Sequence, residues 1–143
     1  MRVDALTLEG WRNYQRQPLT FDDGCNGIYG ENAQGKTNLL EALVYLSCGK
    51  SPRARTDREM IGFDAPAARM AAQVFSRDRQ FRVQVDLFRD RRRKMSVNQV
   101  SAKNSAALSQ VYNMNIISYT STIFCVIVIS KYRNVFSLVV WHL

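Results

Sequence analysis

The segment from Gly30 to Thr37 has the clearest chemical meaning in this sequence, because it reads Gly-Glu-Asn-Ala-Gln-Gly-Lys-Thr. The spacing Gly-x-x-x-x-Gly-Lys-Thr is the P-loop pattern, in which a curled backbone points successive N–H groups at phosphate oxygens. Lys36 can then reach the β- and γ-phosphates, and the Thr37 hydroxyl can ligate Mg²⁺. The candidate nucleotide-binding residues are Gly30, Glu31, Asn32, Ala33, Gln34, Gly35, Lys36, Thr37 and Asn38.

The residues on either side of this loop are those that a P-loop requires. The apolar pair Ile28-Tyr29 precedes the loop and predicts the end of a strand. The run 39–46 follows it and is rich in strong helix formers, which predicts a largely buried helix from about Gly35 to Cys48 that ends at Gly49. The start of that helix would add unpaired N–H groups and the positive end of its dipole to the anion site.

The remaining elements are predicted from hydrophobic patterning. Residues 2–9 predict a buried strand, residues 10–14 a turn, and residues 19–21 a short strand with Pro18 marking an edge or start position. Residues 69–100 switch to a period of two and predict a three-stranded antiparallel meander with one solvated face. Three phenylalanines lie at strand spacing in this region and are expected in the core rather than as base-stacking platforms: Phe75, Phe81 and Phe88.

Composition limits the class of protein. The chain has 143 residues, of which 46% are hydrophobic, so it suits one domain or part of a larger one. Three cysteines, Cys25, Cys48 and Cys125, are odd in number and widely spaced, which indicates free thiols in a reducing cytoplasm. The N-terminus lacks the apolar region of a secretion signal, and no apolar run is long enough to predict a membrane-spanning helix.

The net charge of +8 is unevenly distributed along the chain. Residues 1–60 carry eight basic and eight acidic side chains, whereas residues 61–111 carry ten basic and four acidic ones. A basic excess fits a partner that carries phosphates, such as DNA, and a solvated basic face is the alternative. The candidate phosphate contacts are Arg53, Arg55 and Arg58 after the predicted helix, and a second group, Arg89, Arg91, Arg92, Arg93 and Lys94, at a predicted turn.

The segment from 112 to 143 differs from the rest. The run 125–129 is apolar and β-prone, and residues 112–143 contain no Gly, Pro, Asp or Glu. Without turn residues or acidic residues, this tail is not typical of a soluble surface, and aggregation or disorder is the expected outcome.

Three blocks of the sequence together resemble one family. The block from Gly30 to Ala42 closely resembles the P-loop and helix of the bacterial RecF family of DNA replication and repair proteins. The opening Trp11-Arg12-Asn13-Tyr14 lies at the family's Phe-Arg-Asn-Tyr position, and residues 46–57 resemble its Gly-(Arg/Lys)-Ser-x-Arg loop. The resemblance covers roughly residues 1–111, and its specific part is the P-loop with its helix.

This resemblance implies an α/β fold, the N-terminal part of an ABC-type P-loop ATPase head related to SMC heads, with a small antiparallel β lobe. Such heads bind ATP and Mg²⁺ and close into an ATP-dependent homodimer. The family is expected to bind single-stranded, gapped or junction DNA with RecO and RecR, in the cytoplasm, during replication, repair and the SOS response to DNA damage. The resemblance also implies that Arg12 lies near the nucleotide.

The sequence departs from the family after residue 111. The family's later half carries a Ser- and Gly-rich signature motif and a strand that ends in Asp-Glu, and this chain has neither. The nearest imitation, Val83-Gln84-Val85-Asp86, is an alternating strand in which a metal-binding role for Asp86 is not expected. We therefore expect residues 1–111 to be a head segment and residues 112–143 to be a divergent tail from truncation or a frameshift.

Two alternatives stay open at this point. The first is another P-loop enzyme such as a small kinase, although an antiparallel meander after the first helix does not fit that class. The second is a non-functional fragment whose sheet would lack strands normally supplied by a missing half, leaving an exposed edge. Whether the chain hydrolyses ATP is left undecided by the missing motifs.

Overall fold

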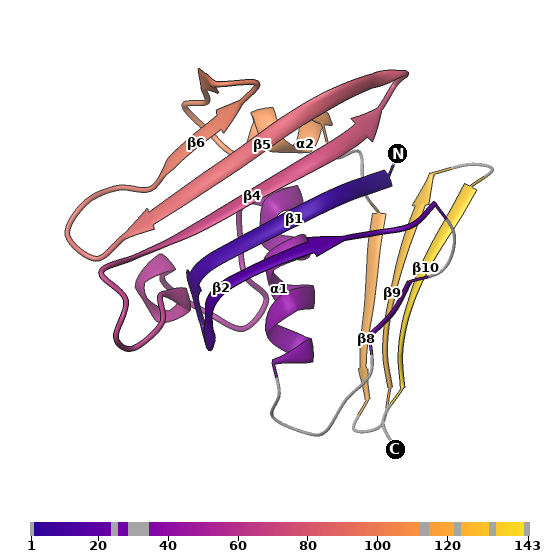
Figure 1. Cartoon of the computed structure of the whole chain (residues 1–143), viewed down its shortest axis with the longest axis horizontal. Coiled ribbons are helices and arrows are strands. Elements are labelled where there is room, and N and C mark those ends of the chain that lie inside the picture. The colour runs from indigo at the N-terminus through magenta and orange to yellow at the C-terminus, as the bar shows by residue number, and fades with distance from the viewer. Residues whose placement is uncertain are drawn as a thin grey trace.

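The computed structural model describes residues 2–23, 26–28, 35–111, 115–121, 124–131 and 134–141. These residues form two β-sheets and a central helix, α1, which spans Lys36–Cys48 (Figure 1). A single 3₁₀ turn, η1 (Asp57–Met60), and a short helix, α2 (Ala106–Val111), complete the helical elements of the described part.

The larger sheet has six strands in the order β2-β1-β4-β5-β6-β7, and every pairing within it is antiparallel. Its strands are β1 (Arg2–Trp11), β2 (Tyr14–Thr20), β4 (Ala67–Ser76), β5 (Arg79–Phe88), β6 (Lys94–Val97) and β7 (Val100–Ser101). The predicted meander is confirmed as β4, β5 and β6. The pairing of β1 with β4, which joins the meander to the N-terminal hairpin, carries no local sequence signal and was not predicted.

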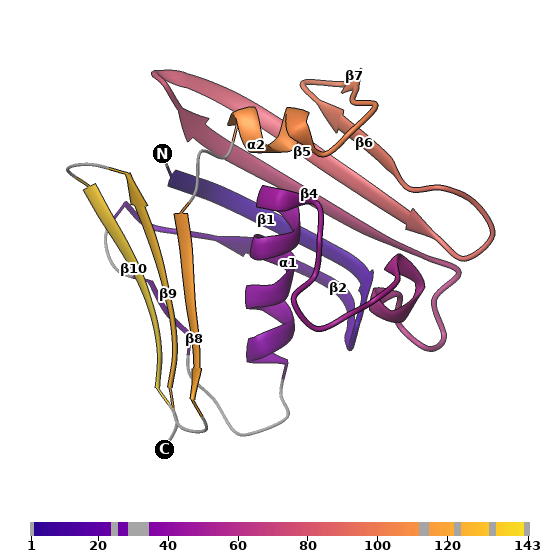
Figure 2. The same cartoon turned by 180° about the vertical axis from the view of Figure 1, so that it is seen from behind.

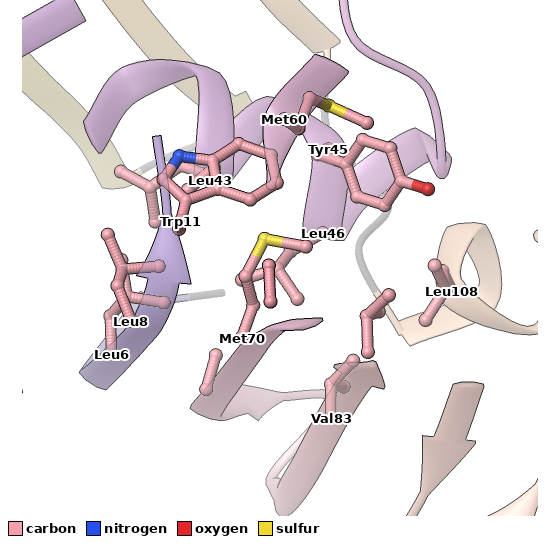
Figure 3. Close-up of a cluster of buried hydrophobic side chains, with 14 of the residues drawn as sticks. Leu6, Leu8, Trp11, Leu43, Tyr45, Leu46, Met60, Met70, Val83 and Leu108 are labelled. Carbon is pink, nitrogen blue, oxygen red and sulfur yellow. The ribbon is translucent and has the colours of Figure 1, made fainter. Parts of the chain in front are cut away.

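One face of this sheet is buried under α1. Along β5, Val83, Val85 and Leu87 have no exposed surface and belong to the same core cluster as Leu43 and Leu46 of the helix. The alternating pattern of the sequence therefore reports burial of one face correctly. Figure 3 shows side chains of the strands and of the helix pointing into this shared core.

The phenylalanine prediction is correct for one residue of three. Phe81 packs against the core cluster. Phe75 and Phe88 are only partly buried and lie outside that cluster, with the guanidinium of Arg2 over one ring at 5.1 Å and that of Arg91 over the other at 3.9 Å. The prediction was wrong for these two because strand parity places them on the opposite face from Phe81.

The N-terminal hairpin is longer and tighter than predicted. The second strand begins at Tyr14 rather than near residue 19, and the turn is reduced to Arg12 and Asn13. Arg12 adopts a positive φ of 51°, which permits this sharp reversal. Pro18 pairs with Thr7 on the edge strand β2, as its missing N–H predicts.

Helix α1 has the predicted bounds. It begins after Gly35 and ends at Gly49, which adopts φ 68° and whose N–H donates to the carbonyl of Tyr45 at 2.7 Å. Tyr45 and Trp11 have no exposed surface and meet edge to face at a centroid distance of 5.9 Å (Figure 3). The aromatic contact fixes the helix against the end of β1.

The second sheet contains the strand that leads into the P-loop. It has the order β3-β10-β9-β8, with β3 (Asn26–Ile28) parallel to β10 (Asn134–Trp141) and antiparallel pairings for β9 (Phe124–Lys131) and β8 (Asn115–Ser121). Figures 1 and 2 place this sheet beside α1, at the opposite end of the molecule from the β5–β6 turn. The predicted tail, residues 112–143, therefore contributes the strands β8, β9 and β10 to this sheet. The β-prone run 125–129 lies within β9.

No helix in the described ranges is long and apolar enough to cross a membrane.

Candidate nucleotide-binding site

The described part of the P-loop begins at Gly35. The earlier predicted contacts, Gly30, Glu31, Asn32, Ala33 and Gln34, lie outside the described residues. Gly35 caps α1 with φ 103°, a conformation that favours glycine, so the second glycine of the motif is required by backbone geometry. Lys36 and Thr37 then form the first turn of the helix, as the motif predicts.

Gly35 is held by the turn between β1 and β2. The Tyr14 hydroxyl donates to the Gly35 carbonyl at 3.1 Å, and a side chain at position 35 would lie only 2.7 Å from Nδ2 of Asn13. Asn38 Nδ2 donates to Asn13 Oδ1 at 2.8 Å, and Trp11 Nε1 donates to the Asn38 carbonyl at 2.8 Å. The Trp-Arg-Asn-Tyr segment therefore supports the start of the P-loop helix from outside.

Lys36 and Thr37 differ in exposure. Lys36 is 8% exposed, whereas Thr37 is an exposed residue of the first helical turn. The N-terminal N–H groups of a helix and its dipole favour an anion, and a lysine in the same turn adds a positive charge. The Thr37 hydroxyl is a hard oxygen ligand of the kind Mg²⁺ takes beside phosphate oxygens and water, so the residues present fit that ion. The described part of the chain contains no group of three or more His, Cys, Asp or Glu side chains that could hold a metal ion.

A second feature lies one helical turn further along α1, where Glu41 is buried with 1% of its side chain exposed. Arg12 donates to both of its carboxylate oxygens, Nε to Oε2 at 2.9 Å and Nη2 to Oε1 at 2.7 Å. Arg53 Nη2 donates to Oε2 at 2.5 Å, and Ser51 Oγ donates to Oε1 at 2.5 Å. We call these four residues the Glu41 cluster.

The charge state of the Glu41 cluster follows from these contacts. Burial alone would raise the pKa of Glu41, but the hydrogen bonds from Arg12, Ser51 and Arg53 outweigh burial and lower its pKa below the ordinary value. Glu41 is therefore ionised at neutral pH. A buried carboxylate with two guanidinium partners satisfies the rule that buried charges are paired.

The structure places two predicted site residues in the Glu41 cluster. Arg12, expected near the nucleotide, also donates Nη1 to the carbonyl of Glu59 at 2.7 Å. Arg53, expected as a DNA contact, also donates Nη2 to Asn38 Oδ1 at 2.6 Å. Both guanidinium groups are thus anchored close to the first turns of α1, and Arg53 is tied to the P-loop helix.

The two basic groups of the sequence are brought together by one arginine. Arg93 Nη1 donates to the Gly49 carbonyl at 2.8 Å and to the Tyr45 hydroxyl at 2.6 Å, and it lies 3.4 Å from Asp57. These contacts hold the β5–β6 turn against the loop that carries Arg55 and Arg58. Figure 1 shows the turn beside that loop.

Of the residues predicted to contact DNA, three are held by internal contacts, and one of them is Arg53, which is paired with Glu41. Arg89 donates to the carbonyls of Gly62, Phe63 and Ala65, and Arg93 is held as described above. The other basic residues of the two groups are exposed, and they are Arg55, Arg58, Arg91, Arg92 and Lys94.

Asp86 does not contribute to the candidate site. It accepts a hydrogen bond from Arg69 Nε at 2.6 Å, and strand parity places it on the sheet face away from α1.

Sequence reasoning missed the roles of Asn13, Tyr14, Glu41 and Ser51. The role of Glu41 could have been predicted from the sequence, because Glu41 is the one acidic residue in an apolar helix that is predicted to be largely buried. The other three roles depend on long-range contacts that local patterning does not encode.

Comparison with known proteins places the chain in the AAA domain family. A family model described as an AAA domain matches residues 5–132, which extends beyond Val111. The DNA replication and repair protein RecF of Clostridium kluyveri is 31% identical over 114 residues, covering 80% of this chain and 31% of that protein. RecF of Shouchella clausii is 46% identical over 77 residues, covering 54% of this chain and 21% of that protein.

Solved structures give the same result. A structure of the recombination mediator protein RecF-ATP in the RecFOR pathway superposes with a TM-score of 0.71 and 31% identity, over 75% of this chain and 30% of that one. An SMC ATPase structure superposes with a TM-score of 0.69 at 20% identity, over 79% of this chain and 78% of that one, which shows the fold alone. The chain spans about a third of the Clostridium kluyveri RecF and of the RecF-ATP chain, and about a fifth of the Shouchella clausii RecF. The likeness to RecF and SMC heads favours an ATPase head over the small-kinase alternative.

Proposed function

The chain belongs to the AAA domain family and is similar to the N-terminal part of RecF proteins, and from this premise we propose that it binds ATP with Mg²⁺ at the start of α1. The observation that carries the proposal is the P-loop motif joined to a helix that begins at Gly35 with φ 103°. Lys36 would hold the β- and γ-phosphates and Thr37 would ligate the metal. The remaining contacts are assigned to residues 30–34 and Asn38.

In this chain, phosphate binding should survive better than hydrolysis. Hydrolysis needs a carboxylate that polarises the attacking water, and the sequence has no Asp-Glu pair and no acidic residue after Asp90. Phosphate binding depends mainly on the loop backbone, the helix start and Lys36, and the last two lie within the described residues.

Equilibrium titration of the chain with ATP, with and without Mg²⁺, tests this function. Lys36→Ala should abolish or strongly weaken binding, while Lys50→Ala, which removes an exposed lysine beyond the end of α1, should leave the affinity unchanged. Binding that ignores Lys36 would refute the proposed site. Phosphate release measured on the same samples should stay at background, and turnover would mean that another carboxylate performs the chemistry.

We also propose that the exposed basic residues beside the β5–β6 turn contact DNA phosphates. Arg55 and Arg58 are exposed and make no side-chain ion pair within the described ranges, whereas Arg53 is held by Glu41. The DNA would be single-stranded, gapped or a junction, and RecO, RecR and a second, ATP-bound copy would be the protein partners. The similarity to the RecF-ATP structure, which belongs to the RecFOR pathway, supports this context.

The salt dependence of DNA binding tests that surface. Each phosphate that the protein no longer neutralises should reduce the log–log salt slope by about 0.7 to 0.9. Arg55→Glu with Arg58→Glu should therefore weaken binding and flatten the slope. The matched double variant Arg77→Glu with Arg79→Glu, at the far end of β4 and β5, should bind as the native chain does. Equal effects of the two doubles would contradict the assignment.

The division at residue 111 is also proposed. Leu108 and Val111 of α2 close the core cluster among the residues whose side chains are described. A chain of residues 1–111 should therefore keep its thermal unfolding transition and its ATP affinity. Loss of both would show that residues 112–143, which pair with β3 through β10, are an integral part of the head.

We propose a cytoplasmic location and a role in the DNA damage and SOS responses, on the basis of the similarity to RecF proteins.

A further inference from the structure

Glu41 has no direct place in phosphate binding, yet it is buried in the helix that carries the P-loop. Taking a carboxylate out of water is costly, and hydrophobic residues of similar volume often replace a buried ion pair without loss of stability. Stability alone therefore does not require this residue. What Glu41 does is hold three groups from two other segments of the chain against α1.

The groups it holds are connected to the start of the helix. Arg12 is the first residue of the β1–β2 turn, whose next residue, Asn13, packs against Gly35. Arg53 contacts Glu41 and Asn38 Oδ1 with one and the same nitrogen. Glu41 lies about 7.5 Å along the helix axis from Lys36, at about 1.5 Å per residue. The carboxylate therefore orients two guanidinium groups within reach of the first turns of α1.

The charges of this arrangement do not cancel. Glu41 contributes one negative charge and the two arginines contribute two positive charges, so the three side chains carry a net charge of +1. Arg12 and Arg53 are 22% and 41% exposed, whereas Glu41 is 1% exposed. The negative charge is thus buried behind the two positive ones, which is the order expected where a polyanion approaches from the outside.

We propose that Glu41 is a positioning residue of the nucleotide site, which acts by fixing Arg12 and Arg53 as a pair of cations beside the P-loop helix. The inference rests on the proposed ATP binding and deepens it. Its ligand is the phosphate chain of a nucleoside triphosphate, and the role of Glu41 is geometric rather than electrostatic. The electrostatic alternative makes the opposite prediction, since removing a negative charge near a polyanion would strengthen binding.

The test compares ATP affinity among charge-matched variants of the whole chain. Glu41→Gln removes one negative charge and so weakens the hydrogen bonds from Arg12 and Arg53. We expect ATP affinity to fall about 10-fold to 100-fold, the range found when the orienting partner of a metal ligand is removed. Glu9→Gln removes the same charge from a partly exposed carboxylate, 3.5 Å from Arg16, and should leave the affinity unchanged. Unchanged or tighter ATP binding by folded Glu41→Gln would overturn the proposal.

Arg53→Lys is a second test, which leaves the buried Glu41 carboxylate unchanged. It keeps the net charge, but a lysine lacks the planar fork and cannot reproduce the contacts of Arg53. Weaker ATP binding at an unchanged unfolding temperature is expected, and native affinity in this variant would overturn the proposal. Lys36→Ala distinguishes failure of the proposed ATP binding from failure of this inference alone. If the native chain binds no ATP, the proposed function fails, whereas if it binds through Lys36 and ignores Glu41 and Arg53, only this inference fails.

Discussion

Replacing Gly35 with alanine tests how far the P-loop motif is fixed by backbone geometry. Gly35 adopts φ 103°, which costs an L-residue about 1–2 kcal/mol. A Cβ atom there would also lie 2.7 Å from Nδ2 and 2.8 Å from Oδ1 of Asn13, so that side chain must move. Movement of Asn13 would break its hydrogen bond with Asn38, worth about 1 kcal/mol.

The two effects together predict that Gly35→Ala lowers the free energy of unfolding by about 2–3 kcal/mol. For a chain of this length, each kcal/mol shifts the unfolding temperature by about 2–4 °C, so a decrease of roughly 4–12 °C is expected. The assay is urea and thermal unfolding followed by circular dichroism.

Gly27→Ala is the matched control. Gly27 lies on β3, and a Cβ there would meet nothing within 4 Å. We expect this variant to unfold within about 0.5 kcal/mol of the native chain, as exposed substitutions usually do. If Gly35→Ala proves as mild as Gly27→Ala, the reasoning from positive φ and close packing at the start of α1 is refuted.

Three further predictions concern the supporting structure. Arg93→Ala should lower stability by about 2 kcal/mol in urea unfolding, because charge-assisted hydrogen bonds are removed, whereas Arg92→Ala on the exposed surface should change it by less than about 0.5 kcal/mol. The pKa of Glu41 is lowered in the folded state, so ionised Glu41 stabilises the fold above its ordinary pKa of 4.5 and this contribution is lost as the pH falls further. The difference in unfolding free energy between the native chain and Glu41→Gln should therefore become smaller as the pH falls below 4.5. A difference that does not change with pH would contradict the stabilising role of ionised Glu41. Trp11→Phe should cost about 1 kcal/mol because its hydrogen bond to the Asn38 carbonyl is absent, measured by thermal unfolding.

The elements with strong local signals could be predicted from the sequence. Helix α1 was bounded correctly because glycines lie at both ends of an apolar run, and β4 to β6 because buried residues alternate with exposed ones. Pro18 marked an edge strand because it cannot donate a ladder hydrogen bond. In each case one short-range physical rule decides the structure.

The parts that escaped prediction depend on contacts between distant segments. Glu41 was visible as an acidic residue in an apolar helix, but its partners lie 29 and 12 residues away along the chain. Arg93 belonged to a basic run that predicted a solvated surface or a DNA contact, and only the fold shows that it points at Tyr45 and Gly49. Charge patterning cannot separate a structural arginine from a binding one, because both satisfy the same composition.

The location of bound ATP is the measurement that bears most directly on the central claim. Hydrogen exchange of the chain with and without Mg-ATP would report which backbone amides become protected. A nucleotide site at the start of α1 predicts slower exchange at residues 30–38, with the protection absent in Lys36→Ala, because those N–H groups would donate to phosphate oxygens. Protection confined to other segments, or protection at residues 30–38 that persists in Lys36→Ala, would contradict that site.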